Sequence, residues 1–306
     1  MKEIKLFAPA TIANVSCGFD VLGLCLDTVG DEMIIRKTTK KGVRISKIIG
    51  QDLPIETEKN VAGVAVLALL KQLNSDAGFE IEIYKNIKPG SGIGSSAASS
   101  AGAVFGVNKL LGEPFTLQEL IPFAMEGEKL ASGTAHADNV APALLGGFTL
   151  VRSYNPLDVI KMNSPKELFA TVIHPQIEIK TADARSVLKK KVTLKETVIQ
   201  LGNLGGLIAG LYTNDYDLIG RSLHDEIVEP SRSILIPEFD AIIKAAKDAG
   251  ALGGGISGSG PSIFALSKGK EIADKVALTM AKAYKNLQID FEIHVSKINT
   301  KGIKIL

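Results

Sequence analysis

The sequence contains no tryptophan, only two cysteines and no long apolar run, and these absences exclude several classes of protein. Cys17 and Cys25 are too few for a disulfide or metal framework, so we expect a reducing compartment, the cytoplasm. The longest apolar run, Val61 to Leu70, is too short to span a bilayer, and residues 1–16 lack the apolar core of a signal peptide. We therefore expect a protein that is neither exported nor embedded in a membrane.

An excess of charge of one sign is also missing. Lys and Arg together number 35 and Asp and Glu 33, which gives a net charge of +2. This balance provides no electrostatic case for nucleic acid or an anionic membrane as a partner. At about 100 to 200 residues per domain, 306 residues predict two domains. We place an N-terminal domain at 1–155 and a C-terminal domain at 165–306, with the aperiodic segment Ser153 to Lys166 as a linker.

A glycine-rich segment, Ile87 to Ser100 (IKPGSGIGSSAASS), lies between a strand pattern and a helix pattern. Glycines at alternate positions suit a loop whose backbone approaches a ligand. Serines then stand at the expected helix start, where free backbone N–H groups and the helix dipole favour an anion. The segment thus predicts a phosphate site, although a tight turn capped by serine explains the loop about as well when it is taken alone.

Two better-known phosphate motifs are excluded. No Gly-Lys follows the loop, so it is not a P-loop. Gly253, Gly255 and Gly258 match the dinucleotide fingerprint by spacing, but they follow the helical pattern Phe239 to Ala249 and precede the strand-like Ser262 to Leu266. The fingerprint requires the opposite order, so this match is spurious.

Two polar segments provide candidate site residues. Asn14 and Asp20 stand among small residues between Ala8 and Gly23, where short polar side chains either form turns or contact a ligand. In the segment Ser132 to Pro142, one His, one Asp and one Asn fall within four positions. A polar loop at the end of a helix explains this second group adequately.

A functional interpretation of that region needs an acid beside the phosphate loop. Magnesium prefers oxygen ligands, typically one or two protein groups together with substrate phosphates. Glu128 and a hydroxyl of the loop could supply them. Arg185 and Arg232 could each bind a carboxylate with two hydrogen bonds, although a surface arginine is usually solvated. Asn60 fits the N-cap of a buried helix better than a ligand contact.

Three segments in order resemble the GHMP kinases, the family of galactokinase, homoserine kinase, mevalonate kinase and phosphomevalonate kinase. They are PATIANVSCGFDVLG, GSGIGSSAAS and GGGISGSGPS. HADNVAP, TADAR and LHDEIVEPSR resemble the homoserine kinase subfamily. The resemblance implies an α+β, two-domain GHMP kinase fold, with an N-terminal ATP-binding domain, a ferredoxin-like C-terminal α/β sandwich and the active site between them. It also implies ATP, Mg²⁺ and L-homoserine as ligands, and a homodimer.

The resemblance also assigns residues. Asn60 would lie near the adenine, Ser96 and Glu128 would hold magnesium, and Asn139, Asp138 and Glu128 would serve catalysis. The triphosphate would be surrounded by Pro89, Gly90, Ser91, Gly92, Ile93, Gly94, Ser95, Ser96, Ala97, Ala98 and Ser99. Homoserine would be surrounded by Asn14, Asp20, His136, Asn139, Thr181, Arg185 and Arg232.

The chain departs from the family pattern at two positions. Ser16 stands where the first motif usually has glycine, which puts the geometry of that turn in question. Only two residues separate Pro89 from Gly92, where three are usual, so Pro89 is shifted in register. Two alternative functions stay open: a sister kinase acting on mevalonate or a sugar, and an inactive member that binds a partner through the same fold. Whether Asp138 is a catalytic base also stays open.

Overall fold

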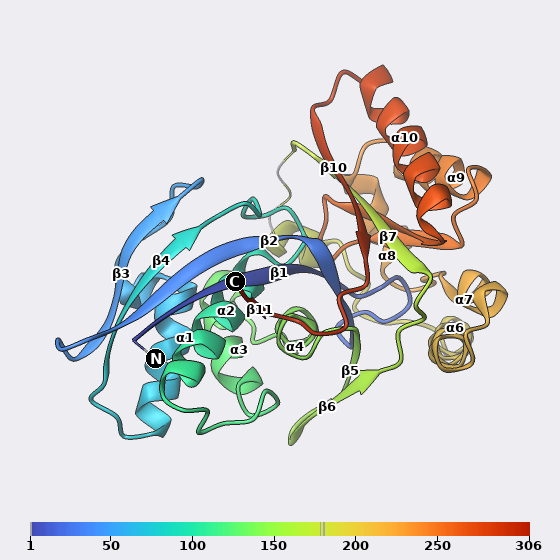
Figure 1. Ribbon diagram of the computed structural model, residues 1–306. Coiled ribbons are helices and arrows are strands. Elements are labelled where there is room, and N and C mark those ends of the chain that lie inside the picture. The colour runs from blue at the N-terminus through green and yellow to red at the C-terminus, as the bar shows by residue number, and fades with distance from the viewer. Residues whose placement is uncertain (1, 178, 180) are drawn as a thin grey trace.

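Two β-sheets organise the chain (Figure 1). The computed structural model describes residues 2–177, 179 and 181–306. The larger sheet has seven strands in the order β11-β1-β2-β4-β3, and β5 pairs with both β2 and β6. Its only parallel pair among the described residues is β3 with β4. The strands are β1 (Glu3–Ala13), β2 (Leu22–Thr38), β3 (Gly42–Ile49), β4 (Gly78–Tyr84), β5 (Phe148–Tyr154), β6 (Leu157–Met162) and β11 (Lys304–Ile305).

Four helices pack together on one side of this sheet (Figure 1). Small residues allow the central helix to be buried on almost every side. At Gly102 an added Cβ would lie 2.5 Å from the sulfur of Met33, so only glycine allows this approach to β2. The helices are α1 (Val61–Gln72), α2 (Ser95–Leu110), α3 (Ile121–Ser132) and α4 (Ala137–Leu145).

The smaller sheet is antiparallel, in the order β10-β7-β9-β8. One face packs against α9 and α10, and the other face continues the core of the first sheet through residues such as Val172 and Phe264. This is the two-layer sandwich expected for the C-terminal half. Its elements are β7 (Leu168–Pro175), α5 (Thr181–Ser186), α6 (Leu194–Thr213), α7 (Tyr216–Ser222), α8 (Glu229–Arg232), α9 (Phe239–Asp248), β8 (Gly253–Ile256), β9 (Ile263–Lys268), α10 (Lys270–Asn286) and β10 (Phe291–Lys297).

The structure corrects three expectations about local structure. The expected polar loop Ser132 to Pro142 contains the start of α4, because the apolar residues that follow continue a helix past Pro142. The expected linker Ser153 to Lys166 contains β6, which forms a hairpin with β5. Between the helical pattern Phe239 to Ala249 and the strand-like Ser262 to Leu266, the sequence predicts a turn, Gly253 to Pro261. This segment begins with β8, a buried strand. The division at 155 and 165 stays a prediction, and β11 returns the end of the chain to the first sheet.

The turn that lacks the family glycine is strained. Asn14, Val15 and Ser16 all have left-handed backbones, with φ of 69°, 42° and 61°. Each such residue other than glycine costs about 1 kcal/mol. The Ser16 hydroxyl is also buried without a hydrogen-bond partner among the described residues. The fold therefore tolerates serine here at the expense of stability.

We predict that Ser16→Gly raises the free energy of unfolding by about 1 kcal/mol, because glycine adopts this conformation without strain. Urea unfolding measures the change. Ser16→Ala is the matched control, since it removes the hydroxyl and keeps the Cβ, and it should stabilise less than Ser16→Gly. A glycine variant less stable than the unmodified chain would contradict the strain argument.

Candidate active site

A cavity of about 540 Å³ lies between the two halves of the chain. The glycine-rich loop and the start of α2 form one wall, and the ends of α3 and α4 that face each other form a second. The turn Asn14 to Asp20, α5 and the turn at Gly258 close the remaining side. The cavity is therefore lined by segments from both sheets.

The glycine-rich loop is held by contacts along its outer side. The carbonyl of Ile93 accepts a hydrogen bond from the Thr11 amide (3.2 Å), and that of Gly92 accepts one from the Ser257 hydroxyl (2.7 Å). Gly92 has φ of 82°, and an added Cβ would lie 2.7 Å from the carbonyl oxygen of Gly260. Only glycine fits this position.

The N-terminus of α2 opens into the cavity. Gly94, which precedes the helix, has a left-handed backbone and provides no side-chain cap, so the first N–H groups of α2 are available to a ligand. These groups and the helix dipole favour an anion. Ser95 and Ser96 line the cavity at the same point. The loop thus has the features of a phosphate site.

A buried ion pair lies beneath this loop. Lys85 and Asp31 have side-chain exposures of 1% and 0% and form a short contact. Lys85 also donates to the Ser95 carbonyl (2.9 Å), and Asp31 accepts from the amides of Asn86 (2.8 Å) and Ile87 (2.9 Å). Burial lowers the pKa of Lys85 and raises that of Asp31, and the attraction between the two charges opposes both shifts.

Two acidic side chains face the cavity from α3 and α4. Glu128 and Asp138 are 5% and 3% exposed, and each has one carboxylate oxygen with no hydrogen-bond partner among the described residues. Burial raises the pKa of Glu128 to about 7, against the effects of Ser96 and Lys85. Burial and the nearby charges of Asp20 and Glu128 raise the pKa of Asp138 to about 7. Unpaired buried oxygens of this kind suit a cation.

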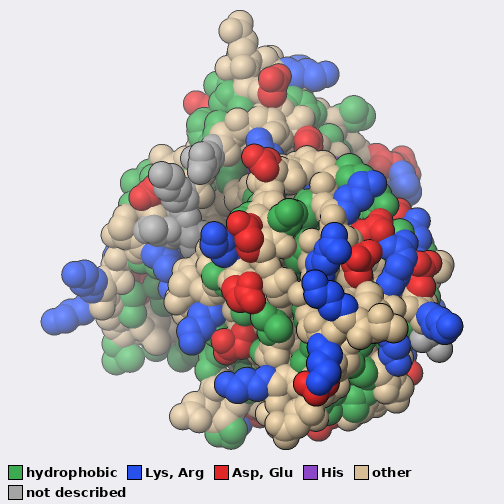
Figure 2. Space-filling model, turned by 90° about the vertical axis from the view of Figure 1, so that its left-hand side faces the viewer, with side chains coloured by type: hydrophobic (Ala, Val, Ile, Leu, Met, Phe, Trp, Pro, Cys, Tyr) green, Lys and Arg blue, Asp and Glu red, His purple; other side chains and the backbone are tan. Residues whose placement is uncertain are grey.

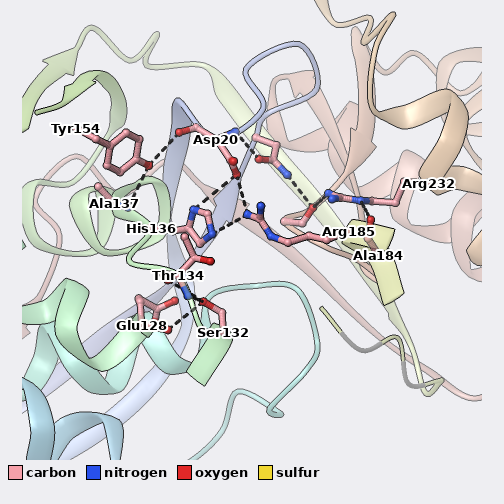
Figure 3. A network of polar contacts seen from close by, with 12 residues as sticks. Asp20, Glu128, Ser132, Thr134, His136, Ala137, Tyr154, Ala184, Arg185 and Arg232 are labelled. Atoms are coloured by element: carbon pink, nitrogen blue, oxygen red, sulfur yellow. Dashed lines mark hydrogen bonds and ion pairs between the residues drawn. The ribbon is translucent and has the colours of Figure 1, made fainter. Parts of the chain in front are cut away.

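A third group of polar side chains surrounds Asp20 (Figure 3). Arg185 lies 3.4 Å from the Asp20 carboxylate and 2.6 Å from Nε2 of His136. Burial lowers the pKa of His136, so the neutral ring accepts this hydrogen bond from the guanidinium. Tyr154 supports the group by donating its hydroxyl to the Asp20 carbonyl (3.0 Å). The cluster places one negative and one positive side chain together at the cavity.

The carbonyl of Gly258 joins two other predicted residues. It accepts hydrogen bonds from Asn14 Nδ2 (2.7 Å) and Arg232 Nη1 (3.0 Å). The Arg232 guanidinium also lies 5.3 Å from the centre of the Phe19 ring. Both side chains are therefore already oriented by the protein.

Asn139, in the first turn of α4, lines the same cavity as the phosphate loop and the Asp20 cluster. Its Oδ1 accepts a hydrogen bond from the Thr11 hydroxyl (2.8 Å), which leaves Nδ2 without a partner in the described part of the chain. This orientation presents an amide donor to a ligand.

The structure brings most of the predicted residues together. The cavity is lined by Asn14, Asp20, Pro89, Gly90, Gly92, Gly94, Ser95, Ser96, Ser99, Glu128, His136, Asp138, Asn139, Arg185 and Arg232. Other predicted residues do not line it: Asn60, Ser91, Ile93, Ala97 and Ala98. Thr181 begins α5, and its side chain lies outside the described part of the structure.

Asn60 serves as a helix cap. Its side chain accepts from the Ala62 amide (3.0 Å) and donates to the Pro54 carbonyl (2.8 Å), so its polar atoms are used within the protein. Its neighbours Lys59 and Val61 line the cavity in its place. The cap interpretation is the one that the structure supports.

Lys85, Asp31 and Tyr154 were missed by sequence reasoning. The sequence does contain a signal for Lys85. In β4, buried and less buried residues alternate, and Lys85 continues the buried positions of Ile81 and Ile83. A lysine at an inward position predicts a buried partner. No comparable signal marks Tyr154.

The comparisons with known proteins agree with this geometry. Residues 60–147 match the N-terminal domain of the GHMP kinases, and residues 207–286 match the GHMP kinases C-terminal domain. A solved structure of a mevalonate kinase superposes with a TM-score of 0.72, covering 97% of this chain and 99% of that one, and its 16% identity shows the fold alone. The chain belongs to the GHMP kinase family.

Relatives of full length narrow the assignment. Homoserine kinase from Chloroherpeton thalassium is 47% identical, and 100% of both chains is covered. Homoserine kinase from Chlorobaculum tepidum is 45% identical over 100% of this chain and 99% of that one. The crystal structure of homoserine kinase from Cytophaga hutchinsonii has a TM-score of 0.97 and 54% identity, covering 100% of this chain and 98% of that one. Within the family, the chain therefore belongs with the homoserine kinases.

The raised pKa of Glu128 predicts how stability depends on pH. Between its ordinary value of 4.5 and about 7, the folded ligand-free protein holds a proton that the unfolded chain has released. Raising the pH through this window therefore destabilises the fold. Glu128→Gln should raise the free energy of unfolding above pH about 8, by on the order of 2 kcal/mol, with little change below pH about 4.

Urea unfolding at several pH values measures this effect. Glu126→Gln is the matched control, because this side chain is two residues away on α3 and exposed, so its effect should stay within about 0.5 kcal/mol. A Glu128→Gln protein that loses stability at high pH would show that the carboxylate is stabilised in the folded chain.

Proposed function

We propose that the chain transfers the γ-phosphoryl group of ATP to the side-chain hydroxyl of L-homoserine, giving O-phospho-L-homoserine, a step of threonine biosynthesis. The observation that carries the proposal is that one cavity holds the open N-terminus of α2, two buried acids, and the cluster of Asp20 with Arg185. The similarity to homoserine kinases along the whole chain supports the same reaction.

The residues around Glu128 fit a magnesium ion. Its unpaired oxygen and the Ser96 hydroxyl are hard oxygen donors at the mouth of the phosphate loop. No group of three or more His, Cys, Asp or Glu side chains forms a cation site among the described residues. This agrees with Mg²⁺, which needs few protein ligands when phosphates supply the rest. When bound, the ion would neutralise charge on the phosphates.

The charges of the Asp20 cluster fit an amino acid. The Asp20 carboxylate would bind the ammonium group, and Arg185 with Arg232 would bind the α-carboxylate. His136 holds Arg185 in place by accepting its hydrogen bond. Mevalonate and sugars lack an ammonium group, so this pairing favours homoserine over the substrates of the sister kinases. An inactive binding protein would have no use for the buried acids.

The attacking hydroxyl requires a positioned polar group. Asn139 suits this task, because its Nδ2 has no partner among the described residues and it lies beside the phosphate loop. Asn14 also carries a side-chain amide at the cavity, but its Nδ2 donates to the Gly258 carbonyl and its Oδ1 accepts from the Asp20 amide (3.0 Å). In our proposal, Asn14 therefore shapes the pocket and Asn139 orients the hydroxyl.

A coupled ATPase assay with magnesium tests the proposal. Homoserine, serine, threonine, mevalonate and galactose are offered separately, and we expect homoserine to give the highest kcat/KM. Serine and threonine carry the same charges with a shorter or branched hydroxyl arm, so they measure the reach between the Asp20 cluster and the phosphate loop. Higher turnover of mevalonate or galactose would overturn the assignment, and no turnover with any acceptor would favour an inactive member.

Asp138→Asn tests whether this acid is a catalytic base. A positioned base typically supplies about 10²- to 10⁴-fold, but a loose phosphoryl-transfer transition state needs little early deprotonation of the alcohol. We expect kcat to stay within about tenfold of the unmodified enzyme, because positioning and charge provide most of the rate. A fall beyond about a hundredfold would identify Asp138 as the base.

We also propose a cytoplasmic homodimer with no nucleic-acid or membrane partner. The near-neutral net charge of +2 supports the absence of polyanionic partners. Within residues 2–177, 179 and 181–306, no helix has both the length and the apolar character that crossing a bilayer requires.

A further inference from the structure

Helix α6 exposes a row of apolar side chains at the outer edge of the molecule (Figure 1). Leu194, Val198, Leu201 and Tyr212 are 80%, 60%, 62% and 53% exposed. The first three are four and three residues apart, and Tyr212 follows eleven residues later, about three turns, so all four lie on one side of the helix. The opposite side is buried through residues such as Leu207. This row, which we call the α6 stripe, also includes Gly205 and the half-buried Ile208.

The α6 stripe differs from the ordinary surface of the protein. The side of the molecule at the left of Figure 1, near β3, is covered with interspersed Lys, Arg, Asp and Glu (Figure 2). By contrast, the sequence from Val198 to Thr213 contains no charged residue. A continuous apolar row without charges is typical of a protein–protein contact.

The α6 stripe has uncharged positions placed symmetrically about residue 203. Large residues stand at both ends, Leu194 and Tyr212, and branched residues follow at Val198 and Ile208. In an antiparallel pair of α6 helices centred at residue 203, Leu194 would oppose Tyr212 and Val198 would oppose Ile208. A two-fold contact requires such self-complementarity, because the same patch meets itself.

At the centre of the proposed helix pair, a large side chain on one helix faces a glycine on the other. Leu201 would oppose Gly205 of the second helix. A Cβ added at Gly205 or Gly202 would have no described atom within 4 Å, so the surface there is open. A leucine side chain facing a glycine allows two helices to approach closely.

Charges at the two ends of α6 are complementary in the same orientation. Lys190 and Lys191 are exposed just before the helix begins, and Asp215 and Asp217 are exposed just after it ends. An antiparallel pair places the lysines of each chain beside the aspartates of the other. Such pairs at the edge of a contact favour one orientation more than they add affinity.

We infer that the α6 stripe binds the α6 stripe of a second copy of this chain, with the two helices antiparallel about a two-fold axis. The inference rests on the homodimer proposed above and is independent of the phosphotransfer reaction. The inner side of α6 contacts the turn Asn14 to Asp20, because Gln200 donates to the Cys17 carbonyl (2.8 Å). Gln200 also donates to Asp225 (2.9 Å). The dimer contact would therefore support the helix that holds this turn.

Sedimentation velocity over about a hundredfold range of protein concentration tests the surface. We expect the unmodified chain to form a dimer. Leu201→Lys should raise the dissociation constant at least tenfold, because a lysine would be buried at the centre of the contact. Leu278→Lys is the matched control, since Leu278 on α10 is 76% exposed and lies outside the stripe, and it should leave the dimer unchanged.

A disulfide test checks the register. Leu201→Cys combined with Gly205→Cys should give a covalent dimer on mild oxidation, because the two positions oppose each other in the proposed pair. Leu278→Cys should not. Cys17 and Cys25 are both buried, so the background is low. Circular dichroism and homoserine-dependent turnover of every variant distinguish a lost contact from a failed fold and from failure of the proposed reaction.

The inference is overturned by a monomer in the unmodified chain, by a dimer that Leu201→Lys leaves intact, or by the absence of a cross-link between the two introduced cysteines. A monomer that cosediments with phospholipid vesicles would overturn it as well, and would assign the stripe to a lipid surface.

Discussion

The buried contact between Lys85 and Asp31 is the interaction on which the geometry of the phosphate loop depends. It ties the end of β4, the inner strand β2 and the first turn of α2 to one point. Removing one partner of such a pair leaves an uncompensated buried charge and costs about 3–5 kcal/mol. The Ser95 carbonyl, in the first turn of α2, accepts a hydrogen bond from Lys85. The pair therefore fixes the loop, and the first amides of α2 stay available to an anion.

Glu128 and Asp138 face the cavity from the wall formed by α3 and α4. Burial raises the pKa of both carboxyls to about 7, and the charges of Asp20 and Glu128 add to the shift of Asp138. One oxygen of each carboxyl has no donor among the described residues. A cation at the phosphate loop would favour the ionised forms and remove this penalty. Without a cation, the two buried acids therefore lower the stability of the fold. This is a local cost of the kind that proteins carry at functional sites.

Local sequence patterns predicted most of this structure, and the failures have physical causes. The period-two pattern before Tyr84 was strong because one face of β4 is buried. The helix after Ser95 is buried on almost every side, and its large apolar residues still recur at helical spacing. The pattern of α4 was hidden because its first turn carries the polar residues that line the cavity. Lys85 and Asp31 lie 54 residues apart, and no local pattern reports a contact between distant strands. Residue roles came from the family resemblance, not from spacing.

The phosphate loop and the turn at Gly258 meet through their backbones at the cavity. A Cβ added at Gly258 would lie 3.0 Å from the carbonyl oxygen of Gly92, so the phosphate loop and the second glycine-rich turn are in direct contact. The Gly258 carbonyl also accepts the hydrogen bonds that orient Asn14 and Arg232. A shift of this turn against the loop would therefore change the phosphate site and the amino-acid site together. In the proposed reaction, glycine on both sides would keep the distance between nucleotide and acceptor short, which direct transfer between them requires.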